Sequence, residues 1–567
     1  GIAKFKLKGN IMKKNNKHRY VKQLEGEVKS GQTSRREFLR KSVLLGMSIP
    51  VAYGLTGLSM SESVFADNAK KGGNFRVSMR VQEMSDPALF EWSYPSNVAR
   101  HVIEPLVQMG NDGLARPKLL ESWQASDDLK TWTLNLRQNV TWSNGDEFIA
   151  DDVIFNINRW LDPKTGSSMQ SQLISLTHEV DTGEKNDDGS TKMSRVAMPG
   201  AVKRIDKHTV QLTLNKADIA IPEALSSFTA LIVNRNFTGD FSSNPVGTGA
   251  FELVNIEVGV SAILKRRADG LYWGGDALLD QITYVDLGDD TSVDLAAYVS
   301  DQIDYSYQVS ADQVQAYETI PFIELLSAKS ATTGIARMNV TQKPFDDVRV
   351  RRAVALAVDN ERVLTIGYQD LGSIAENHHV SPIHPEYAPL PKLSRNIVKA
   401  KALLAQAGYP NGIDLVIDCS ASPSWQTNTC LAIADQVRAA GINLRVNIMP
   451  GGSYWDVWNT TPFGLTEWNH RPLGVQVLNL AYRTGAPWNE TGYANPEFDR
   501  LLDQALTILD AKERSKVVLK LEKILQDDAV MVQPFWLNSY SAVNKRVKNV
   551  VLHPSFEHDF NKVWIDA

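Results

Sequence analysis

Aromatic, cationic and amide side chains are concentrated in residues 465–492, which read LTEWNHRPLGVQVLNLAYRTGAPWNETG. Tryptophans can supply flat apolar walls, and an arginine can supply a forked donor that matches a carboxylate or a phosphate. The stretch lacks sustained apolar periodicity, which favours a small-molecule pocket; a surface loop with buried tryptophans is the alternative. The candidate ligand-binding residues of this stretch are Trp468, His470, Arg471, Trp488, Asn489 and Glu490.

The composition is that of a globular protein with an acidic body. The chain has 567 residues, of which 43% are hydrophobic and 22% charged, and this length allows several lobes. The formal net charge of −5 conceals an asymmetry, because 13 bases but only four acids precede residue 67. The remaining 47 bases and 61 acids give a net charge of −14. This argues against a nucleic-acid partner, since phosphates bind to cationic surfaces.

The first 66 residues have the organisation of an export leader. The segment SRREFLR, residues 34–40, precedes an uncharged and moderately apolar run over residues 42–60. This resembles a twin-arginine signal peptide, so we expect cleavage near Ala66 and a periplasmic mature protein. A basic tail followed by an internal helix, or an uncleaved membrane anchor, are the alternatives. No later run approaches the roughly 18 to 20 apolar residues that a spanning helix needs.

Cysteine usage is sparse, with only Cys419 and Cys430, 11 positions apart. In an oxidising compartment we expect a disulfide between them, which could contribute about 3 kcal/mol. Two buried thiols are the alternative.

Common catalytic constellations are absent from the sequence. It contains no G-x-x-x-x-G-K-[ST] phosphate loop, no H-E-x-x-H, no G-x-S-x-G and no C-x-x-C. His378, His379 and His384 could bind a soft metal, but adjacent histidines point in different directions, so a loop beside the binding site is favoured. We therefore expect no enzyme activity, no cofactor and no metal.

The mature region alternates strand and helix patterns. A strand is predicted near residues 75–81, and Trp132, Leu134 and Leu136 alternate in another. Strands over residues 413–417 and 444–448 flank a predicted helix over residues 429–440, a βαβ-like unit that implies parallel pairing. The polar tract DTGEKNDDGS, residues 181–190, is predicted to be a mobile surface loop. The fold class is therefore α/β.

Several blocks of this region resemble the family 5 extracellular solute-binding proteins, the peptide, opine and nickel binders of ATP-driven importers. The blocks are the Trp, acidic turn, alternating strand and Asn-Gly turn of residues 123–152, NPVGTGAF at 244–251, YWGG at 272–275, PFDDVRVRRA at 344–353 and AKALLAQAGYPNG at 400–412. They run through much of the mature chain.

The resemblance implies a two-lobed periplasmic binding protein of type II, similar to cluster C. We expect a leader over residues 1–66, lobe I over 67–333 with an inserted subdomain at about 112–240, lobe II over 334–537, and a C-terminal return to lobe I over 538–567. The chain crosses between the lobes near residues 330–337 and 535–539. The resemblance also brings Glu91, Trp92 and Ser93 of lobe I to the cleft wall opposite lobe II, where Trp425 is a further candidate.

One motif departs from the family pattern. Its peptide binders hold the substrate amine with an acid in a D-x-x-D/E-P motif, whereas this chain has Trp468 and Arg471 at the two acidic positions. Glu467 lies one position away, but side-chain direction on a strand reverses with a one-residue shift. The change favours a ligand with a carboxylate or phosphate, because Arg binds either through its fork. A structural ion pair of Arg471 with a neighbouring acid is the alternative.

The expected function is the periplasmic substrate-binding component of an ABC transporter. It would capture a small polar solute, such as a peptide, an opine or a related anionic compound, and deliver it as a monomer to inner-membrane permeases. A ligand-sensing receptor on the same fold and an exported hydrolase are the alternatives.

Overall fold

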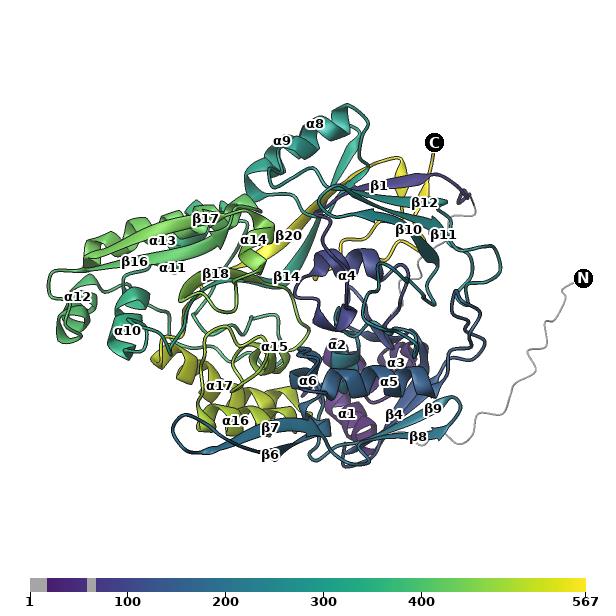
Figure 1. Cartoon of the computed structure of the whole chain (residues 1–567), viewed down its shortest axis with the longest axis horizontal. Helices are drawn as coiled ribbons and strands as arrows, with labels where there is room; N and C mark the ends of the chain where they lie inside the picture. The colour runs from purple at the N-terminus through teal and green to yellow at the C-terminus, as the bar shows by residue number, and fades with distance from the viewer. Residues whose placement is uncertain (1–17, 59–67) are drawn as a thin grey trace, which may run out of the picture.

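The computed structural model describes residues 18–58 and 68–567. Its framework is a 12-stranded mixed sheet that passes through both lobes (Figure 1). Along the main path the strands are β10 (Phe251–Glu257), β11 (Ser261–Arg266), β12 (Gln281–Val285), β1 (Asn74–Ser78), β13 (Tyr305–Ser306), β20 (Phe535–Asn544), β14 (Ile323–Met338), β18 (Phe463–Trp468), β16 (Ile413–Ser420) and β17 (Ile442–Met449). The short strands β15 (Gly372–Ile374) and β19 (Met531–Val532) pair with β20 and β14. The predicted α/β class is confirmed.

The two longest strands of the sheet connect its halves. β14 and β20 pair antiparallel, and their register shifts between Lys329 and Thr332. β20 remains the neighbour of β14 on both sides of this irregularity, up to Thr333, and from Thr333 to Met338 β14 also pairs with β18. A register shift bends a strand locally. Both strands occupy the stretches in which the interlobe crossings were predicted; the domain boundaries themselves stay a prediction.

One end of the sheet is the expected parallel unit. β16 and β17 pair in parallel from Ile413↔Ile442 to Ser420↔Met449, and α13 (Ser424–Val437) connects them. The helices that pack near this end are α10 (Val348–Leu356), α11 (Asn360–Tyr368), α12 (Ile397–Gln406) and α14 (Gly451–Trp455). Three more helices of this lobe, α15 (Gly474–Ala481), α16 (Pro496–Leu506) and α17 (Ala511–Asp527), lie below β18 in Figure 1. Asn495 caps α16 by accepting from two backbone amides, as expected for an Asn-Pro helix start.

A second group of elements surrounds the other half. A four-stranded sheet has the order β4 (Leu120–Ala125), β5 (Thr131–Leu136), β9 (Thr209–Thr213) and β8 (Val202–Asp206). The helices of this half are α4 (Ser93–Ala99), α5 (Ala150–Leu161), α6 (Met169–Gln172), α7 (Ile221–Leu225), α8 (Val293–Val299) and α9 (Val314–Glu318). Short pairs are formed by β2 (Val107–Met109) with β3 (Ala115–Pro117) and by β21 (Val547–Lys548) with β22 (Trp564–Ile565).

The polar tract 181–190 has regular structure, contrary to the loop prediction. It belongs to a hairpin of β6 (Thr177–Lys185) and β7 (Thr191–Ala197), closed by a turn in which Asn186 N–H donates to Ser190 O and Gly189 has φ +82°. Because β6 is mostly exposed on both faces, its side chains lack the apolar alternation that identifies strands in a sequence.

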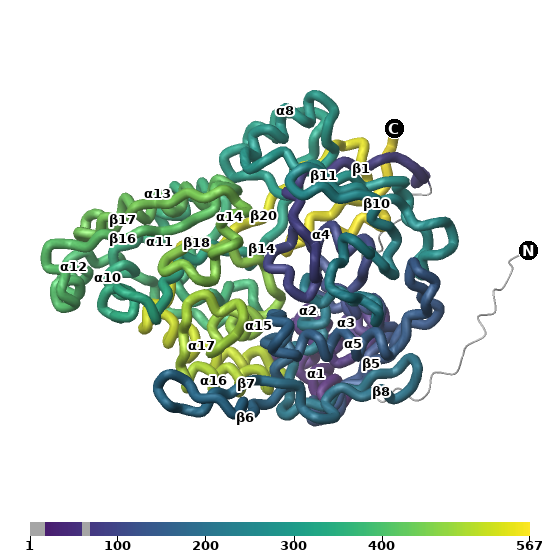
Figure 2. The backbone as a smooth tube through the Cα atoms, in the orientation of Figure 1, coloured from purple at the N-terminus to yellow at the C-terminus, as the bar shows by residue number. Residues whose placement is uncertain are grey.

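The N-terminal segment packs against the body, whereas its resemblance to a signal peptide predicts a leader that is removed from the mature protein. Residues 18–58 form α1 (Arg19–Lys29), α2 (Arg35–Leu44) and α3 (Ile49–Thr56), which lie in the lower part of Figures 1 and 2, and α2 contacts β3 and β4. Leu39, Val43 and Leu44 of α2 are at most 3% exposed and join the main core. The expected cleavage position near Ala66 lies outside the described residues.

Cys419 and Cys430 are both buried, and both are free thiols. The expected disulfide is therefore absent, and the alternative of two buried thiols is the one that the structure has. The two residues lie in the core of the β16 and α13 unit, where a hydrogen bond from Cys430 lowers the pKa of Cys419. Burial raises the pKa of Cys430.

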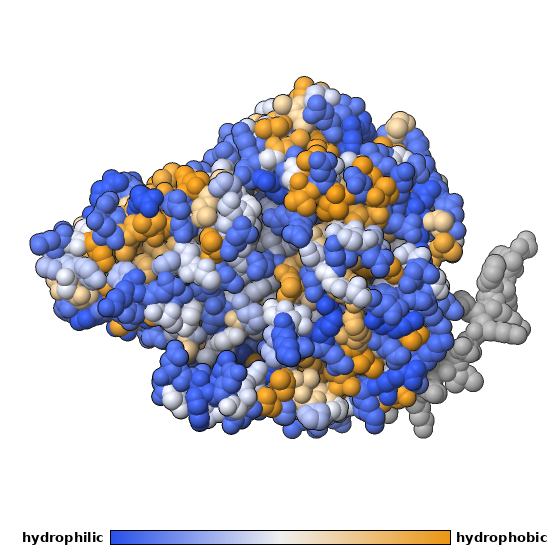
Figure 3. All heavy atoms as spheres, viewed as in Figure 1, coloured by the Kyte–Doolittle hydropathy of each residue, from blue (hydrophilic) through white to orange (hydrophobic). Residues whose placement is uncertain are grey.

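Hydrophilic residues cover most of the face in Figure 3, and hydrophobic residues form separate patches on it. Within residues 18–58 and 68–567, the helices are too short or too polar for any of them to traverse a bilayer.

A buried ion pair anchors α17, and we predict that breaking it is costly. Arg514 Nη2 lies 3.0 Å from Glu386 Oε2, and both side chains are fully buried. Arg514→Met leaves Glu386 without its cation, so we expect about 3 to 5 kcal/mol of lost stability, measured as a shift in the chemical unfolding midpoint. The double variant Arg514→Met/Glu386→Gln should recover part of the loss.

The matched control is Arg500→Met, which removes an exposed pair with Glu497 on α16. Its effect should stay within about 1 kcal/mol. Equal losses at Arg500 and Arg514 would contradict the role of the buried pair.

Candidate functional site: an arginine and a tryptophan cluster between the lobes

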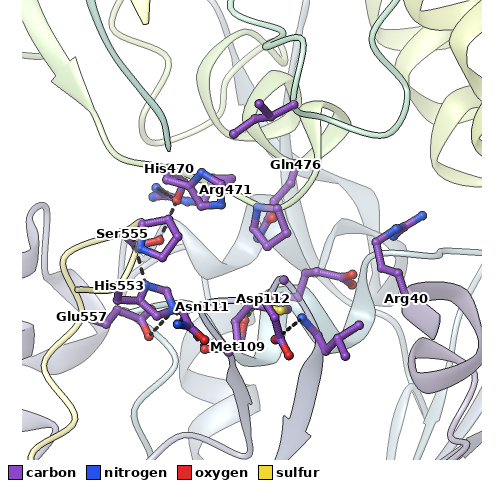
Figure 4. A pocket seen from close by; sticks show the side chains of 18 of the residues that line it. Arg40, Met109, Asn111, Asp112, His470, Arg471, Gln476, His553, Ser555 and Glu557 are labelled. Atoms are coloured by element: carbon purple, nitrogen blue, oxygen red, sulfur yellow. Dashed lines mark hydrogen bonds and ion pairs between the residues drawn. The ribbon is translucent and has the colours of Figure 1, made fainter. Parts of the chain in front are cut away.

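A cavity of about 370 Å3 lies where the lobes meet (Figure 4). Figure 4 shows His470, Arg471 and Gln476 on one side of it, Met109, Asn111 and Asp112 opposite, and His553, Ser555 and Glu557 between them. Arg40 of α2 lies on a further side. Four chain segments that are distant in sequence therefore enclose one space.

Arg471 is a buried cation of this cavity, and Glu557 is the acid that acts on it from beyond ion-pair distance. The arginine side chain is 6% exposed, and Nη1 donates to the backbone oxygens of Asn469 and His470 at 3.0 and 3.3 Å. Among the described residues no ion pair involves it, so the structural ion pair considered for Arg471 is not present. Burial lowers its pKa to about 10. A buried guanidinium without a counter-ion is unfavourable until an anion binds to it.

The backbone around Arg471 is held by two histidines. His384 Nδ1 accepts from Ser381 N–H at 2.9 Å, so Nε2 carries the proton and donates to Arg471 O at 2.9 Å. His470 Nδ1 accepts from Ala331 N–H at 2.9 Å. The histidine loop lies beside the site, as favoured from the sequence. No cluster of three metal-ligating side chains occurs in the part of the chain that the structure describes.

Five tryptophans form a cluster next to Arg471. Trp468 and Trp488 are 6.0 Å apart between ring centroids, and Trp458 lies 6.4 and 6.3 Å from them. Trp92 stacks on Trp455 at 5.3 Å. Edge-to-face and stacked pairs at these distances are favourable. The cluster thus joins the α4 side of the cleft to the β18 side.

Arg471 packs against the same cluster. Its guanidinium carbon lies 5.3 Å from the ring centre of Phe228 and 6.0 Å from that of Trp488. These contacts stabilise a cation without neutralising it, because a ring face offers a quadrupole and not a charge. The fork therefore stays available to an anion.

Two acids face the aromatic cluster. Glu467 is 4% exposed, accepts from Gln426 Nε2 at 3.1 Å, and its Oε1 has no hydrogen-bond partner among residues 18–58 and 68–567. Burial raises the pKa of Glu467 to about 8. Glu91 accepts from Trp458 Nε1 at 2.8 Å, and burial raises its pKa as well. An acid one position from the family's motif thus lines the aromatic space that Arg471 also lines, in a form that is neutral below about pH 8.

The structure brings together most of the residues chosen from the sequence. His470, Arg471 and Ser93 line the cavity, and Glu91, Trp92, Trp468 and Trp488 surround the adjoining aromatic space with Arg471. Ser93 Oγ lies 2.6 Å from Tyr307 Oη. These placements do not test ligand contact, which stays a prediction.

Three candidates lie elsewhere. Glu490 forms a fully buried ion pair with Arg337 at 3.0 Å, and burial raises its pKa to about 7. Asn489 closes a turn by donating to Arg483 O and Tyr493 O. Trp425 packs on Phe535 and Tyr368 in the lobe II core. Their polarity or ring size suggested a site, but each satisfies a local structural requirement instead.

Sequence reasoning missed other residues of the site. Trp455 and Trp458 follow the Gly451-Gly452 pair at a helical spacing, and this Trp-x-x-Trp pattern could have identified them. Phe228, Lys329 and His553 line the cavity from three separate segments and carry no local signal.

Burial of Glu467 predicts a pH dependence of stability. The folded state holds the Glu467 proton up to about pH 8, whereas an unfolded chain releases it near the ordinary value of 4.5. The free energy of unfolding should therefore fall as pH rises between these values, by about 1.4 kcal/mol per pH unit. Glu467→Gln should flatten the decline in melting temperature from pH 5 to pH 8, and the exposed Glu318→Gln should not. An unchanged slope in Glu467→Gln would contradict the assignment.

Comparisons with known proteins agree with this architecture. The model of the bacterial extracellular solute-binding proteins, family 5 Middle, matches residues 115–489. The dipeptide-binding protein DppE of Bacillus subtilis is 24% identical over 543 residues, which cover 90% of this chain and 96% of that protein.

Solved structures share the fold. The oligopeptide-binding protein OppA of Haemophilus influenzae, in complex with the peptide RPPGFSPFR, superposes with a TM-score of 0.77 at 22% identity, covering 88% of this chain and 100% of that one. The periplasmic binding protein AgaA of A. tumefaciens R10, in complex with agropinic acid, has a TM-score of 0.76 at 24% identity and covers 87% and 99%. The predicted two-lobed fold is thereby confirmed. Since the family model spans well over half of its length, this chain belongs to the family 5 bacterial extracellular solute-binding proteins.

Proposed function

We propose that this protein captures a small polar solute outside the cytoplasm and delivers it to the permeases of an ABC importer. The observation that carries the proposal is the buried, unpaired Arg471 at a cavity between two lobes. Family members are solute-binding proteins, and relatives named for peptides and an opine acid cover nearly the whole chain. We further propose export through the twin-arginine signal with cleavage near Ala66, a periplasmic location, a monomeric state and no catalysis.

The solute should carry a carboxylate or a phosphate. A guanidinium forks onto either group with two parallel hydrogen bonds, and such charge-assisted bonds are the strong ones in proteins. The aromatic cluster beside Arg471 offers apolar area for the rest of the molecule. The anion therefore determines the orientation of the solute, and the rings bury its body.

A second specificity element is Glu467. Glu467 lines the aromatic space, its Oε1 has no hydrogen-bond partner among the described residues, and its raised pKa keeps the carboxyl protonated at neutral pH. A solute amine placed there would favour the ionised form and lower this pKa. A solute hydroxyl or carbonyl would instead bind the neutral acid. Peptides and opines thus differ in how they engage Glu467.

Closure of the lobes can be driven by the same cluster. Trp92 and Glu91 of the α4 side contact Trp455 and Trp458 of the β18 side. A solute bound between these rings adds contacts with both sides at once, which stabilises the closed state by its differential affinity.

The anion anchor is tested by Arg471→Gln. Native mass spectrometry of the purified protein identifies a co-purifying solute, and a thermal-shift panel of dipeptides, their C-terminal amides and opine-type carboxylates identifies binders. Calorimetry with the best carboxylate should show a loss of affinity of tenfold or more, since a hydrogen bond to a charged group contributes about 1.5 to 3 kcal/mol. Arg362→Gln, at an exposed site, is the matched control. Unchanged affinity in Arg471→Gln would overturn the anchor.

The aromatic contact across the cleft is tested by Trp92→Ala. Loss of the stacked pair should weaken binding of the same solute by about tenfold, because buried aromatic contacts contribute about 0.5 to 1.5 kcal/mol beyond their area. Leu89→Ala in the preceding turn, where the side chain is 47% exposed, should bind normally. Equal affinities in both variants would count against closure through this cluster.

A further inference from the structure

The second helix of the N-terminal segment contacts both lobes. On the lobe II side, Lys41 Nζ lies 3.2 Å from Asp510 Oδ2, and the lysine side chain is only 1% exposed. On the lobe I side, Trp123 Nε1 donates to Leu44 O at 2.9 Å. A lysine is rarely buried unless it is paired. The helix is therefore held at two points on opposite sides of the cleft.

Tight packing adds to these two bonds. Gly46 follows α2 with φ +97°, and a Cβ there would lie 2.3 Å from the carbonyl oxygen of Trp123. Only glycine fits so close an approach in this backbone conformation. Phe38 and Leu39 are buried at 2% and 3% exposure, while Arg35 and Arg36 stay exposed. The segment thus has a defined inner face and a defined outer face.

The same helix forms part of the cavity wall. Arg36, Glu37 and Arg40 line the cavity whose opposite wall contains Arg471 (Figure 4). Arg40 Nη2 donates to Glu37 Oε1 at 2.7 Å, which holds its guanidinium in place along the wall. Without α2 this side of the cavity would lose its covering residues.

We propose that residues 34–47 act as a strap across the cleft, which binds both lobes through the Asp510 and Trp123 contacts and restricts entry to the solute cavity. While the strap is in place, the lobes cannot separate without breaking the Lys41 pair or the Trp123 bond. Once it has left, the cavity is open on that side. Solute loading then follows release of the N-terminal segment.

The inference rests on the proposed function only in taking this cavity as the solute site. Entry of a probe into the cavity can be measured without any solute. A negative result for the strap can therefore be distinguished from a negative result for the Arg471 anchor. The probe is a small sulfonate-bearing methanethiosulfonate reagent that modifies a cysteine introduced at Ser226, a buried residue of the cavity wall. The chain without Ser226→Cys supplies the background from the two native thiols.

Release of the strap is produced by Gly46→Ala, since its Cβ collides with the Trp123 carbonyl. The matched control is Gly54→Ala in the same N-terminal segment, where a Cβ meets no atom within 4 Å. We expect labelling at position 226 to be at least tenfold faster in full-length Gly46→Ala, and unchanged in Gly54→Ala. Circular dichroism confirms that each variant is folded.

A second variant that releases the strap keeps the test valid if Gly46→Ala fails to fold. Lys41→Glu places a carboxylate beside Asp510 and Glu37 and should also accelerate labelling, whereas Lys41→Arg, which keeps the positive charge, should retain the slow rate. Equal labelling rates in the parent chain, Gly46→Ala and Lys41→Glu would overturn the strap. Rates that rise equally in Gly54→Ala would also overturn it, because they would show a general loosening of the segment.

Discussion

The arrangement of the site depends on one electrostatic constraint, the burial of the Arg471 guanidinium without a counter-ion. Transfer of a cation from water to a protein interior is costly unless it is paired, and the described residues in contact with this guanidinium offer only backbone carbonyls and ring faces, while Glu557 acts on it from beyond ion-pair distance. The fold tolerates the free-energy cost of burying this charge because the surrounding structure holds the Arg471 side chain in position. An anion that binds to Arg471 forms a charge-assisted pair with the guanidinium. The free-energy cost of burying this cation without a partner is therefore recovered when the anion binds.

Neighbouring residues support this state in distinct ways. His384 binds the Arg471 carbonyl through a tautomer that the Ser381 amide selects. The Glu386 carboxylate accepts from Val475 N–H and pairs with Arg514, so the loop after Arg471 is connected to α17. Burial alone would raise the pKa of Glu386, but the Arg514 charge and the hydrogen bonds from Val475 N–H and Arg514 hold it below its ordinary value. The unpaired charge of Arg471 therefore lies near an ion pair, Arg514 with Glu386, whose charges compensate each other.

The lobes are connected at several points of different strength. The β14 and β20 strands provide covalent continuity, and their register irregularity lies where the sheet passes from one half to the other. The tryptophan cluster and the Glu91 to Trp458 hydrogen bond connect the two sides of the cleft. Helix α2 adds a third connection through Lys41 and Leu44. Of these connections, only the strands are covalent. The contacts of the tryptophan cluster can be exchanged for contacts with a solute, and those of α2 are lost when the N-terminal segment leaves.

The sequence by itself determined the α/β class, the parallel pairing of the strands around α13 and the family, and it selected Trp468 and Arg471 as candidates for ligand binding. These follow from local periodicity and from motifs with fixed spacing, which are properties of neighbouring residues. Tertiary structure alone decided that Glu490 pairs with Arg337, that Trp425 is core, that the cysteines are unbridged, and that Phe228 and α2 reach the cavity. Whether a charge is paired, or a ring lines a pocket, depends on partners more than 100 residues away, because burial and counter-ions arise only when distant segments pack together.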